Sequence, residues 1–444
     1  MIERTDELVS TPARELAVTC IERAIEAANP TRLIERHLTI EANELDVNGR
    51  VIDLDAFERI LVVGGGKAAA AQAHALYDVI GDRIDGGVVV TPAPPDMAGP
   101  IRILPGDHPI PSEDGVASTA ELMAILEGAD EQTLVIAVLS GGGSALLPAP
   151  AGVIDLEALQ AVTNTLLESG ATIEEINAVR KHISKLKGGG LARLSAPATV
   201  ITLVTSDVIG DQLPVIASGP FVPDPTTYRN ALSVISRYDL SVPSRVRTHL
   251  ENGAAGELPE TPKPGDPTFD RIDHVLLAGS RTGIQAAFDH VSSTKWTPLW
   301  LSSSVRGEAR EAAKTHVAIA EESLATGRPV DPPAVLLSAG ETTVTVRGDG
   351  VGGPNLEFAL SAAIELAEHV TVGAVDTDGI DGASPAAGAI VDGGTVNQSG
   401  PARAALAAND AYPYLADRGD TVETGPTETN INDFRVVVIA SEHR

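Results

Sequence analysis

The sequence predicts an α/β fold built from two doubly wound domains with mostly parallel sheets. At 444 residues the chain is longer than one ordinary hydrophobic core supports. Short apolar runs recur along it, and most are continuous rather than alternating, which is typical of parallel strands buried on both faces. Helical stretches lie between many of these runs, as in βαβ units.

The first expected element is an amphipathic helix within residues 11–29. Thr11 is its N-cap, Pro12 takes the first helical position, and Asn29-Pro30 ends it. Its apolar face comprises Leu16, Cys20, Ile21 and Ile25. Nine strands are then predicted, at Ile60–Val63, Gly87–Thr91, Leu134–Leu139, Thr199–Val204, His274–Ala278, Pro298–Ser302, Ala334–Ser338, Thr371–Val375 and Arg435–Ala440.

Composition shifts suggest where the domains begin and end. Residues 251–270 are rich in Pro and Gly and have no apolar period, which is typical of a linker. We therefore expect an N-terminal helical segment (1–45), a Rossmann-like domain (46–255), a linker (256–270) and a C-terminal α/β domain (271–444).

The charge balance narrows the classes of partner. The formal net charge is −29, with 61 Asp and Glu against 32 Lys and Arg. Such a surface repels nucleic acid and anionic membranes, and it favours solubility at high salt, so we expect a halophilic source. An acidic enzyme of a mesophile is the alternative. The single Cys20 excludes an intramolecular disulfide and a cysteine-based zinc site. Neither a signal peptide nor a membrane span is apparent, which predicts a cytoplasmic protein.

Five loops that follow predicted strands carry glycine together with polar side chains. Ligands of open parallel sheets bind beyond the carboxyl ends of the strands. The loops are Gly64–Lys67, Ser140–Pro150, Thr205–Pro220, the loop from Ser338 and the loop from Asp376. Lys67 is one of only seven lysines, so we interpret it as a fixed cation for a phosphate or a carboxylate.

The first loop fits neither common nucleotide motif well. Gly64, Gly66 and Ala69 match G-x-G-x-x-A, but the acid expected after the next strand for a ribose hydroxyl is missing. It is not a Walker loop, because Ala68 stands where Ser or Thr is required.

Two further stretches concentrate charge. "INAVRKHISKLKGGGLAR" holds five cations, most of which we expect on a solvated helix face, with Arg180 as the exception. "DTDGIDG" (376–382) offers three carboxylates and suits Mg²⁺ that keeps several waters. His108 and His182 are equally compatible with structural and catalytic roles.

At these loops the chain resembles the archaeal and bacterial glycerate 2-kinases that carry a C-terminal MOFRL domain, a family formerly often named hydroxypyruvate reductases. The stretches that carry the resemblance run in order along nearly the whole chain: "GGGKAAAAQAHAL", "GDHPIPSEDG", "LSGGGSALLPAP", "INAVRKHISKLKGGGLA", "TSDVIGDQLPVIASGPFVPDPTT", "GETTVTV", "DTDGIDG" and "GPTETNINDF". The resemblance implies transfer of the ATP γ-phosphoryl group to the 2-hydroxyl of D-glycerate, with Mg²⁺. It also implies an active-site cleft between the domains and an N-terminal helix that packs on the C-terminal domain.

The resemblance also implies the site residues. The catalytic candidates are Lys67, Arg180 and Asp207. Asp207 and Asp211 are candidates either to orient the acceptor hydroxyl or to hold Mg²⁺ through water. The candidates for binding substrate or phosphate are Gly65, Gly66, Ser140, Gly141, Gly142, Gly143, Ser144, Asp211, Glu341 and Asn355, and those for Mg²⁺ are Asp376 and Asp378.

One position departs from the family pattern. The family usually reads G-G-R-N-Q-E where this chain has Gly352–Glu357, so the family arginine is Pro354. Either another cation substitutes, with Arg281, Arg306 and Arg347 as candidates, or the acceptor preference has changed.

Two other functions remain open from the sequence. One is an NAD(P)H-dependent hydroxypyruvate reductase, and the other is a non-catalytic sensor of phosphorylated sugars. The partners expected are small molecules, and whether the chain forms a homo-oligomer stays open.

Overall fold

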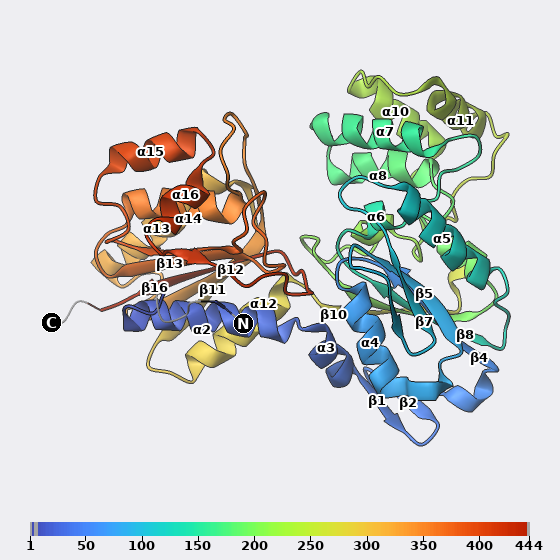
Figure 1. Cartoon of the computed structure of the whole chain (residues 1–444), viewed down its shortest axis with the longest axis horizontal. Coiled ribbons are helices and arrows are strands. Elements are labelled where there is room, and N and C mark those ends of the chain that lie inside the picture. The colour runs from blue at the N-terminus through green and yellow to red at the C-terminus, as the bar shows by residue number, and fades with distance from the viewer. Residues whose placement is uncertain (1, 4–7, 442–444) are drawn as a thin grey trace. The chain divides into compact units, whose positions relative to one another are not determined.

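The computed structural model describes residues 2–3 and 8–441 (Figure 1). Residues 1, 4–7 and 442–444 lie outside the described residues. The prediction that the N-terminus carries no signal peptide falls partly on these residues. The chain forms two compact units. The central unit spans residues 30–277, and the terminal unit combines residues 1–29 with residues 278–444.

These limits differ from the predicted domain boundaries. The central unit begins at Pro30 and ends at Leu277, whereas the sequence predicted a domain over 46–255. Residues 256–270, predicted as a linker, belong to the central unit, where Glu260 and Lys263 make side-chain hydrogen bonds. The Pro- and Gly-rich segment is therefore an ordered loop of the central unit and does not link the two units.

A seven-stranded sheet is the core of the central unit, with strand order β10-β9-β8-β4-β5-β7-β6. Its strands are β4 (Arg59–Gly65), β5 (Gly86–Thr91), β6 (Asp96–Ala98), β7 (Ile101–Pro105), β8 (Thr133–Leu139), β9 (Thr199–Thr205) and β10 (Ile272–Ala278). The pairs β4-β5, β4-β8, β5-β7 and β8-β9 are parallel, while β6 pairs antiparallel with β7. The carboxyl ends of β4, β8 and β9 therefore meet at one edge of the sheet, where the predicted loops begin.

Helices and a small sheet complete the central unit (Figure 1). The sheet is antiparallel, with β1 (Leu38–Glu41), β2 (Glu44–Val47) and β3 (Arg50–Asp53). The helices are α3 (Pro30–His37), α4 (Ala69–Ile80), α5 (Glu113–Leu126), α6 (Gly143–Leu146), α7 (Leu156–Glu168), α8 (Ile173–His182), α9 (Gly190–Ser195), α10 (Tyr228–Arg237) and α11 (Ser244–Ala254). Helices α7, α8, α10 and α11 share a separate apolar cluster.

The terminal unit holds a six-stranded sheet of order β11-β12-β16-β13-β14-β15. Its strands are β11 (Thr297–Glu308), β12 (Ala334–Thr343), β13 (Val370–Asp376), β14 (Gly388–Asp392), β15 (Thr421–Val422) and β16 (Asp433–Ile439). Only β11-β12 is parallel; the other four pairs are antiparallel. This differs from the predicted parallel arrangement, because β16 inserts between β12 and β13. A buried strand reads as a continuous apolar run in either direction.

Helices cover both faces of this sheet (Figure 1). On one face lie α2 (Pro12–Ala27) and α12 (Ser280–Ser292), and on the other lie α13 (Ala309–Thr326), α14 (Pro354–Glu365), α15 (Ser399–Ala407) and α16 (Ala411–Ala416). Thr11 caps α2 by accepting a hydrogen bond from the Arg14 backbone N–H. Arg14 then pairs with Asp420 and Asp392, which joins α2 to the C-terminal part of the same unit.

The mixed α/β class with two domains is confirmed, and each of the nine predicted strands overlaps an observed one. The sequence missed β1–β3, β6, β7, β14 and β15, which are short or follow another strand without an intervening helix. No helix in the described part of the chain has the length and apolar character needed to cross a membrane.

Candidate active site

The turn after β4 requires glycine at two positions. Gly64 has a φ of +139°, and a Cβ atom there would lie 1.9 Å from the Val138 carbonyl oxygen on β8. Gly66 has a φ of +146°, and its Cβ would lie 2.1 Å from Ser140 Oγ. Such φ values and contacts exclude other residues. The glycines therefore bring the turn against the loop that follows β8.

The backbone amides of this turn donate hydrogen bonds to other groups of the protein. The N–H of Gly66 donates to Val90 O (3.1 Å), that of Lys67 to Gly141 O (2.8 Å), and that of Ala68 to Ser140 Oγ (3.1 Å). These amides are therefore not available to a phosphate, as they would be in a dinucleotide fold. The G-x-G-x-x-A match is thus coincidental, and attraction of an anion at this turn depends on the side chain of Lys67.

The loop Ser140–Ser144 contacts two other predicted or candidate residues. A Cβ on Gly141 would lie 2.1 Å from Asp207 Oδ2, and a Cβ on Gly142 would lie 3.1 Å from His108 Cδ2. The Asp207 carboxylate and the His108 ring therefore lie directly against this backbone. Within the described residues, the amides of Gly141 and Gly142 donate to no acceptor. The loop can therefore offer two amides to an anion.

A chain of side-chain hydrogen bonds links this loop to α8. Ser144 Oγ lies 2.7 Å from Ser218 Oγ, and Ser218 Oγ donates to Asn177 Oδ1 at 2.9 Å. Asn177 precedes Arg180 by one helical turn, so both lie on the same face of α8. Burial lowers the pKa of the Arg180 guanidinium. The structure thus brings Lys67, Gly141–Ser144, Asp207 and Arg180 into one contiguous region of the central unit.

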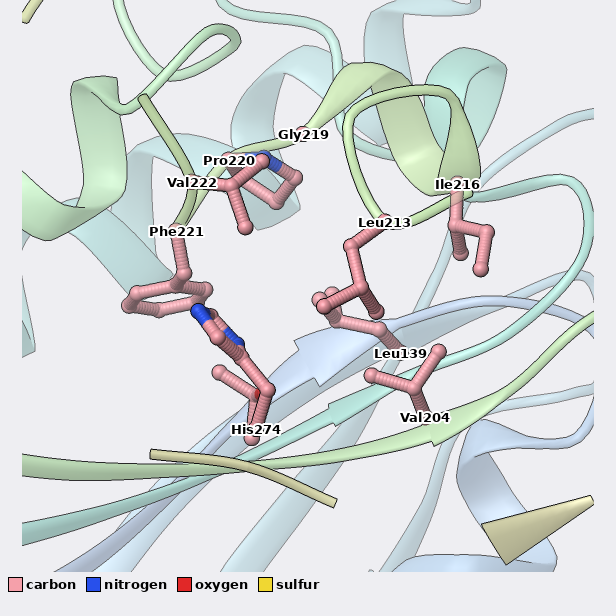
Figure 2. Close-up of a pocket in the computed structure, with 10 residues that line it drawn as sticks. Leu139, Val204, Leu213, Ile216, Gly219, Pro220, Phe221, Val222 and His274 are labelled. Carbon is pink, nitrogen blue, oxygen red and sulfur yellow. The ribbon is translucent and has the colours of Figure 1, made fainter. Parts of the chain in front are cut away.

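Asp211 lies elsewhere on the loop after β9. Its backbone has a φ of +53°, and its Oδ1 atom is buried without a hydrogen-bond partner in the described structure. Beneath this loop lies an apolar cavity of about 10 Å³ (Figure 2). It is lined by residues that include Leu139, Val204, Leu213, Ile216, Phe221 and His274. This cavity has room for one water at most, so it is not a substrate site.

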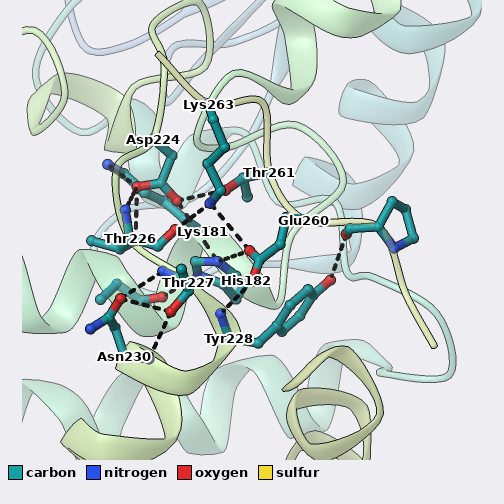
Figure 3. Close-up of polar contacts among 12 residues, drawn as sticks. Lys181, His182, Asp224, Thr226, Thr227, Tyr228, Asn230, Glu260, Thr261 and Lys263 are labelled. Carbon is teal, nitrogen blue, oxygen red and sulfur yellow. Dashed lines mark hydrogen bonds and ion pairs between the residues drawn. The ribbon is translucent and has the colours of Figure 1, made fainter. Parts of the chain in front are cut away.

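The end of α8 differs from the solvated face that the sequence predicted. Lys181 is buried, and its Nζ lies 3.4 Å from Asp224 Oδ1 (Figure 3). The His182 ring lies between two acceptors, with Nδ1 2.7 Å from Ala178 O and Nε2 3.1 Å from Glu260 Oε2. His182 thus contacts the 256–270 segment directly and is structural, whereas Lys181 is linked to it through Asp224, whose Oδ2 accepts from Thr261 Oγ1.

In the terminal unit four acidic residues converge at the ends of β12, β13 and β16. Asp376 on β13 stands opposite Asp433 on β16. The pKa of Asp376 lies well above its ordinary value because of burial, then because of the negative charges of Asp378, Asp433 and Glu341. Asp433 was not among the predicted residues, although it is the second-last residue of the quoted stretch "GPTETNINDF".

Asn355 contacts this acidic group through Asp433. It is fully buried, and its Nδ2 donates to Asp433 Oδ1 (2.6 Å) and to Asp381 Oδ1 (3.2 Å). Asp381 also accepts the backbone N–H groups of Asn355 and Leu356, and burial raises its pKa to about 7. These bonds cap the start of α14, where Pro354 takes the first helical position. Pro354 therefore has a structural role.

The three candidate replacement cations, Arg281, Arg306 and Arg347, are all exposed. Arg306 lies beside a predicted site residue, because it stands opposite Glu341 in the β11-β12 register.

The carboxylates fit Mg²⁺ only as partial ligands. Over residues 2–3 and 8–441, no three His, Cys, Asp or Glu side chains are grouped to hold a metal ion. Asp376 and Asp378 each use one oxygen to accept a backbone N–H, from Asp378 and Ile380 respectively. Mg²⁺ typically takes one or two carboxylates and completes its shell with water and substrate phosphates. The mutual repulsion at Asp376 is what such a cation would relieve.

The fold defines a two-unit α/β protein, with a Lys67–Asp207 cluster in one unit and an acidic cluster around Asp376 in the other. Residues 16–251 match the domain of unknown function DUF4147, and residues 334–433 match the MOFRL family. The chain belongs to the glycerate kinase family.

Relatives support this assignment over nearly the full length. Glycerate 2-kinase from Pyrococcus horikoshii is 37% identical over 98% of this chain and 99% of its own. The crystal structure of the glycerate kinase from Thermotoga maritima has a TM-score of 0.83 at 36% identity, covering 96% of this chain and 99% of its own. A protein of Agrobacterium vitis with a provisional hydroxypyruvate reductase name is 42% identical over 86% of this chain and 87% of its own.

Proposed function

We propose that the protein transfers the γ-phosphoryl group of ATP to the 2-hydroxyl of D-glycerate, which gives 2-phosphoglycerate and ADP. The observation that carries this proposal is the contact of Lys67, the Gly141–Ser144 loop and Asp207 in a chain 37% identical to a glycerate 2-kinase. Phosphoryl transfer depends mainly on positioning and on charge placed around the moving group. These residues supply a cation, two amides and a carboxylate.

The roles follow from the chemistry of each side chain. The Lys67 ammonium would stabilise negative charge on the transferred phosphoryl group. The Asp207 carboxylate would orient the acceptor hydroxyl and take its proton as the new P–O bond forms. Asp376 and Asp378 would hold Mg²⁺, which neutralises phosphate charge when it is bound.

The reductase alternative has less physical support. Bound dinucleotides need free amides after the first strand, and the amides of Gly66, Lys67 and Ala68 are already hydrogen-bonded. The decisive test is incubation with ATP, Mg²⁺ and D-glycerate, followed by ³¹P NMR of the product. Formation of 2-phosphoglycerate is expected. Formation of 3-phosphoglycerate, or NADH oxidation with hydroxypyruvate in place of any phosphorylated product, would contradict the proposal.

The acidic surface also supports a proposal about the working environment. With 61 acidic and 32 basic residues, mutual repulsion destabilises the folded chain at low ionic strength. Screening by concentrated salt relieves that repulsion, so we infer adaptation to high salt. The thermal midpoint should rise clearly between about 0.1 M and about 2 M KCl.

A further inference from the structure

Two neighbouring cations of the central unit have no acidic partner. Lys187 is 5% exposed, and its Nζ donates to the backbone carbonyl of Leu147 at 3.1 Å. In the described structure this is its only side-chain hydrogen bond, and the Arg180 guanidinium forms no hydrogen bond or ion pair. The nearby buried Lys181, by contrast, pairs with Asp224. In a chain with almost twice as many acids as bases, two unpaired adjacent cations are unexpected.

Leaving these charges unpaired is unfavourable for the folded protein. A buried charge without a counter-ion is strongly unfavourable, because the water it loses on folding is not replaced by an opposite charge. Burial, followed by the charge of Arg180, lowers the pKa of Lys187 to about 7. Within the described residues, the hydrogen bond that the Lys187 ammonium forms is the one to Leu147 O.

A third group beside these cations also has no partner. The Asn177 side chain is 3% exposed, and its Nδ2 is buried without an acceptor in the described residues. Its Oδ1 accepts from Ser218, whose Oγ contacts Ser144. A backbone hydrogen bond also joins the residue after Lys187 to Ser218, since the Gly188 N–H donates to Ser218 O at 3.0 Å. Asn177 is therefore linked to Ser144, Lys187 binds Leu147 at the other end of the same segment, and Arg180 lies close enough to Lys187 to lower its pKa.

We propose that Arg180, Lys187 and Asn177 form a subsite for a substrate oxyanion, either the carboxylate of glycerate or a phosphate of the nucleotide. This inference rests on the proposed function. Arg180, the partly exposed member, contacts the anion, while Lys187 and Asn177 lie behind it with a second charge and a spare donor. Because Lys187 holds Leu147 and Asn177 reaches Ser144 through Ser218, the anion also orders the Ser140–Ser144 loop.

The test is a direct binding measurement by isothermal titration calorimetry, with one substrate at a time so that no turnover occurs. Wild type, Lys187→Met and Arg180→Met are each titrated with D-glycerate, with its uncharged amide and with ATP. Lys185→Met is the matched control, because Lys185 is exposed and only two residues away. We expect about tenfold weaker binding of one charged probe in both site variants, the loss typical of a hydrogen bond to a charged group.

The probe that binds more weakly to the variants shows whether the oxyanion is the glycerate carboxylate or a nucleotide phosphate. If it is D-glycerate, the preference of wild type for glycerate over its amide should also fall, which a merely structural role for Lys187 would not cause. Binding of both probes within twofold of wild type by folded Lys187→Met and Arg180→Met overturns the proposal. So does a wild type that binds neither probe. Because binding is measured without catalysis, failure of the kinase assay alone leaves this result interpretable.

Discussion

The backbone of Gly141 lies directly against the carboxylate of Asp207: a Cβ atom at position 141 would stand 2.1 Å from Asp207 Oδ2. No positive φ is required at Gly141, so alanine fits its backbone, and the atom in the way is the end of a flexible side chain. The Asp207 side chain would therefore move while the fold is kept.

We expect Gly141→Ala to lower kcat by about a hundredfold, the cost of displacing a positioned group by an ångström. Steady-state kinetics measure this, with Gly86→Ala as the control because its nearest neighbour would lie 4.0 Å away. A folded Gly141→Ala variant with wild-type kcat would show that Asp207 does not act in the reaction.

Lys67 should contribute through its charge alone, since the amides around it are already bonded. Lys67→Met keeps the length and the apolar stem of the side chain. We expect kcat at saturating ATP and glycerate to fall by roughly a hundredfold or more, as on removal of one preorganised charge. Circular dichroism is the control for folding, and a loss of only about threefold would remove Lys67 from the proposed chemistry.

Asp378 should influence Mg²⁺ through the acidic group around Asp376. Asp378→Asn should raise the Mg²⁺ concentration for half-maximal activity by about tenfold or more. Asp349→Asn is a matched control, because Asp349 is an exposed acid of the same unit. An unchanged Mg²⁺ titration would place the metal elsewhere, with Asp207 or Asp211 as the next candidates.

Lys187 should make the stability of the ligand-free protein depend on pH. Its pKa falls from 10.5 in the unfolded chain to about 7 in the folded one, so the unfolded state binds more protons between these values. Stability contributed at this site therefore rises as pH increases from about 7 towards 10.5. Below pH 7 the residue is protonated in both states, and the full penalty of its burial remains.

Urea unfolding of wild type and Lys187→Met at several pH values measures this effect. Relative to Lys187→Met, wild type should be least stable near neutral pH and should gain stability towards pH 10, whereas Lys185→Met should follow wild type throughout. A difference between wild type and Lys187→Met that does not change with pH would mean that Lys187 is not titrating in the folded protein.

The sequence by itself determined the α/β class, the nine main strands and the glycine turn after the first of them. Local chemistry is sufficient for these features. Buried strands read as apolar runs, Thr11 and Pro12 start a helix wherever it packs, and Gly64 and Gly66 report a backbone that no other residue adopts.

The tertiary structure alone decided the partners of these elements. The insertion of β16 between β12 and β13 joins segments far apart in the chain, so strand direction in that sheet was not readable from apolar runs. The partners of charged side chains were likewise not readable from the sequence. Lys181 and Lys187 stand in the same basic stretch, "RKHISKLK", yet Lys181 pairs with Asp224, whereas Lys187 binds the Leu147 carbonyl. Whether a buried cation has a counter-ion depends on residues distant in sequence, and this decides its pKa and its role.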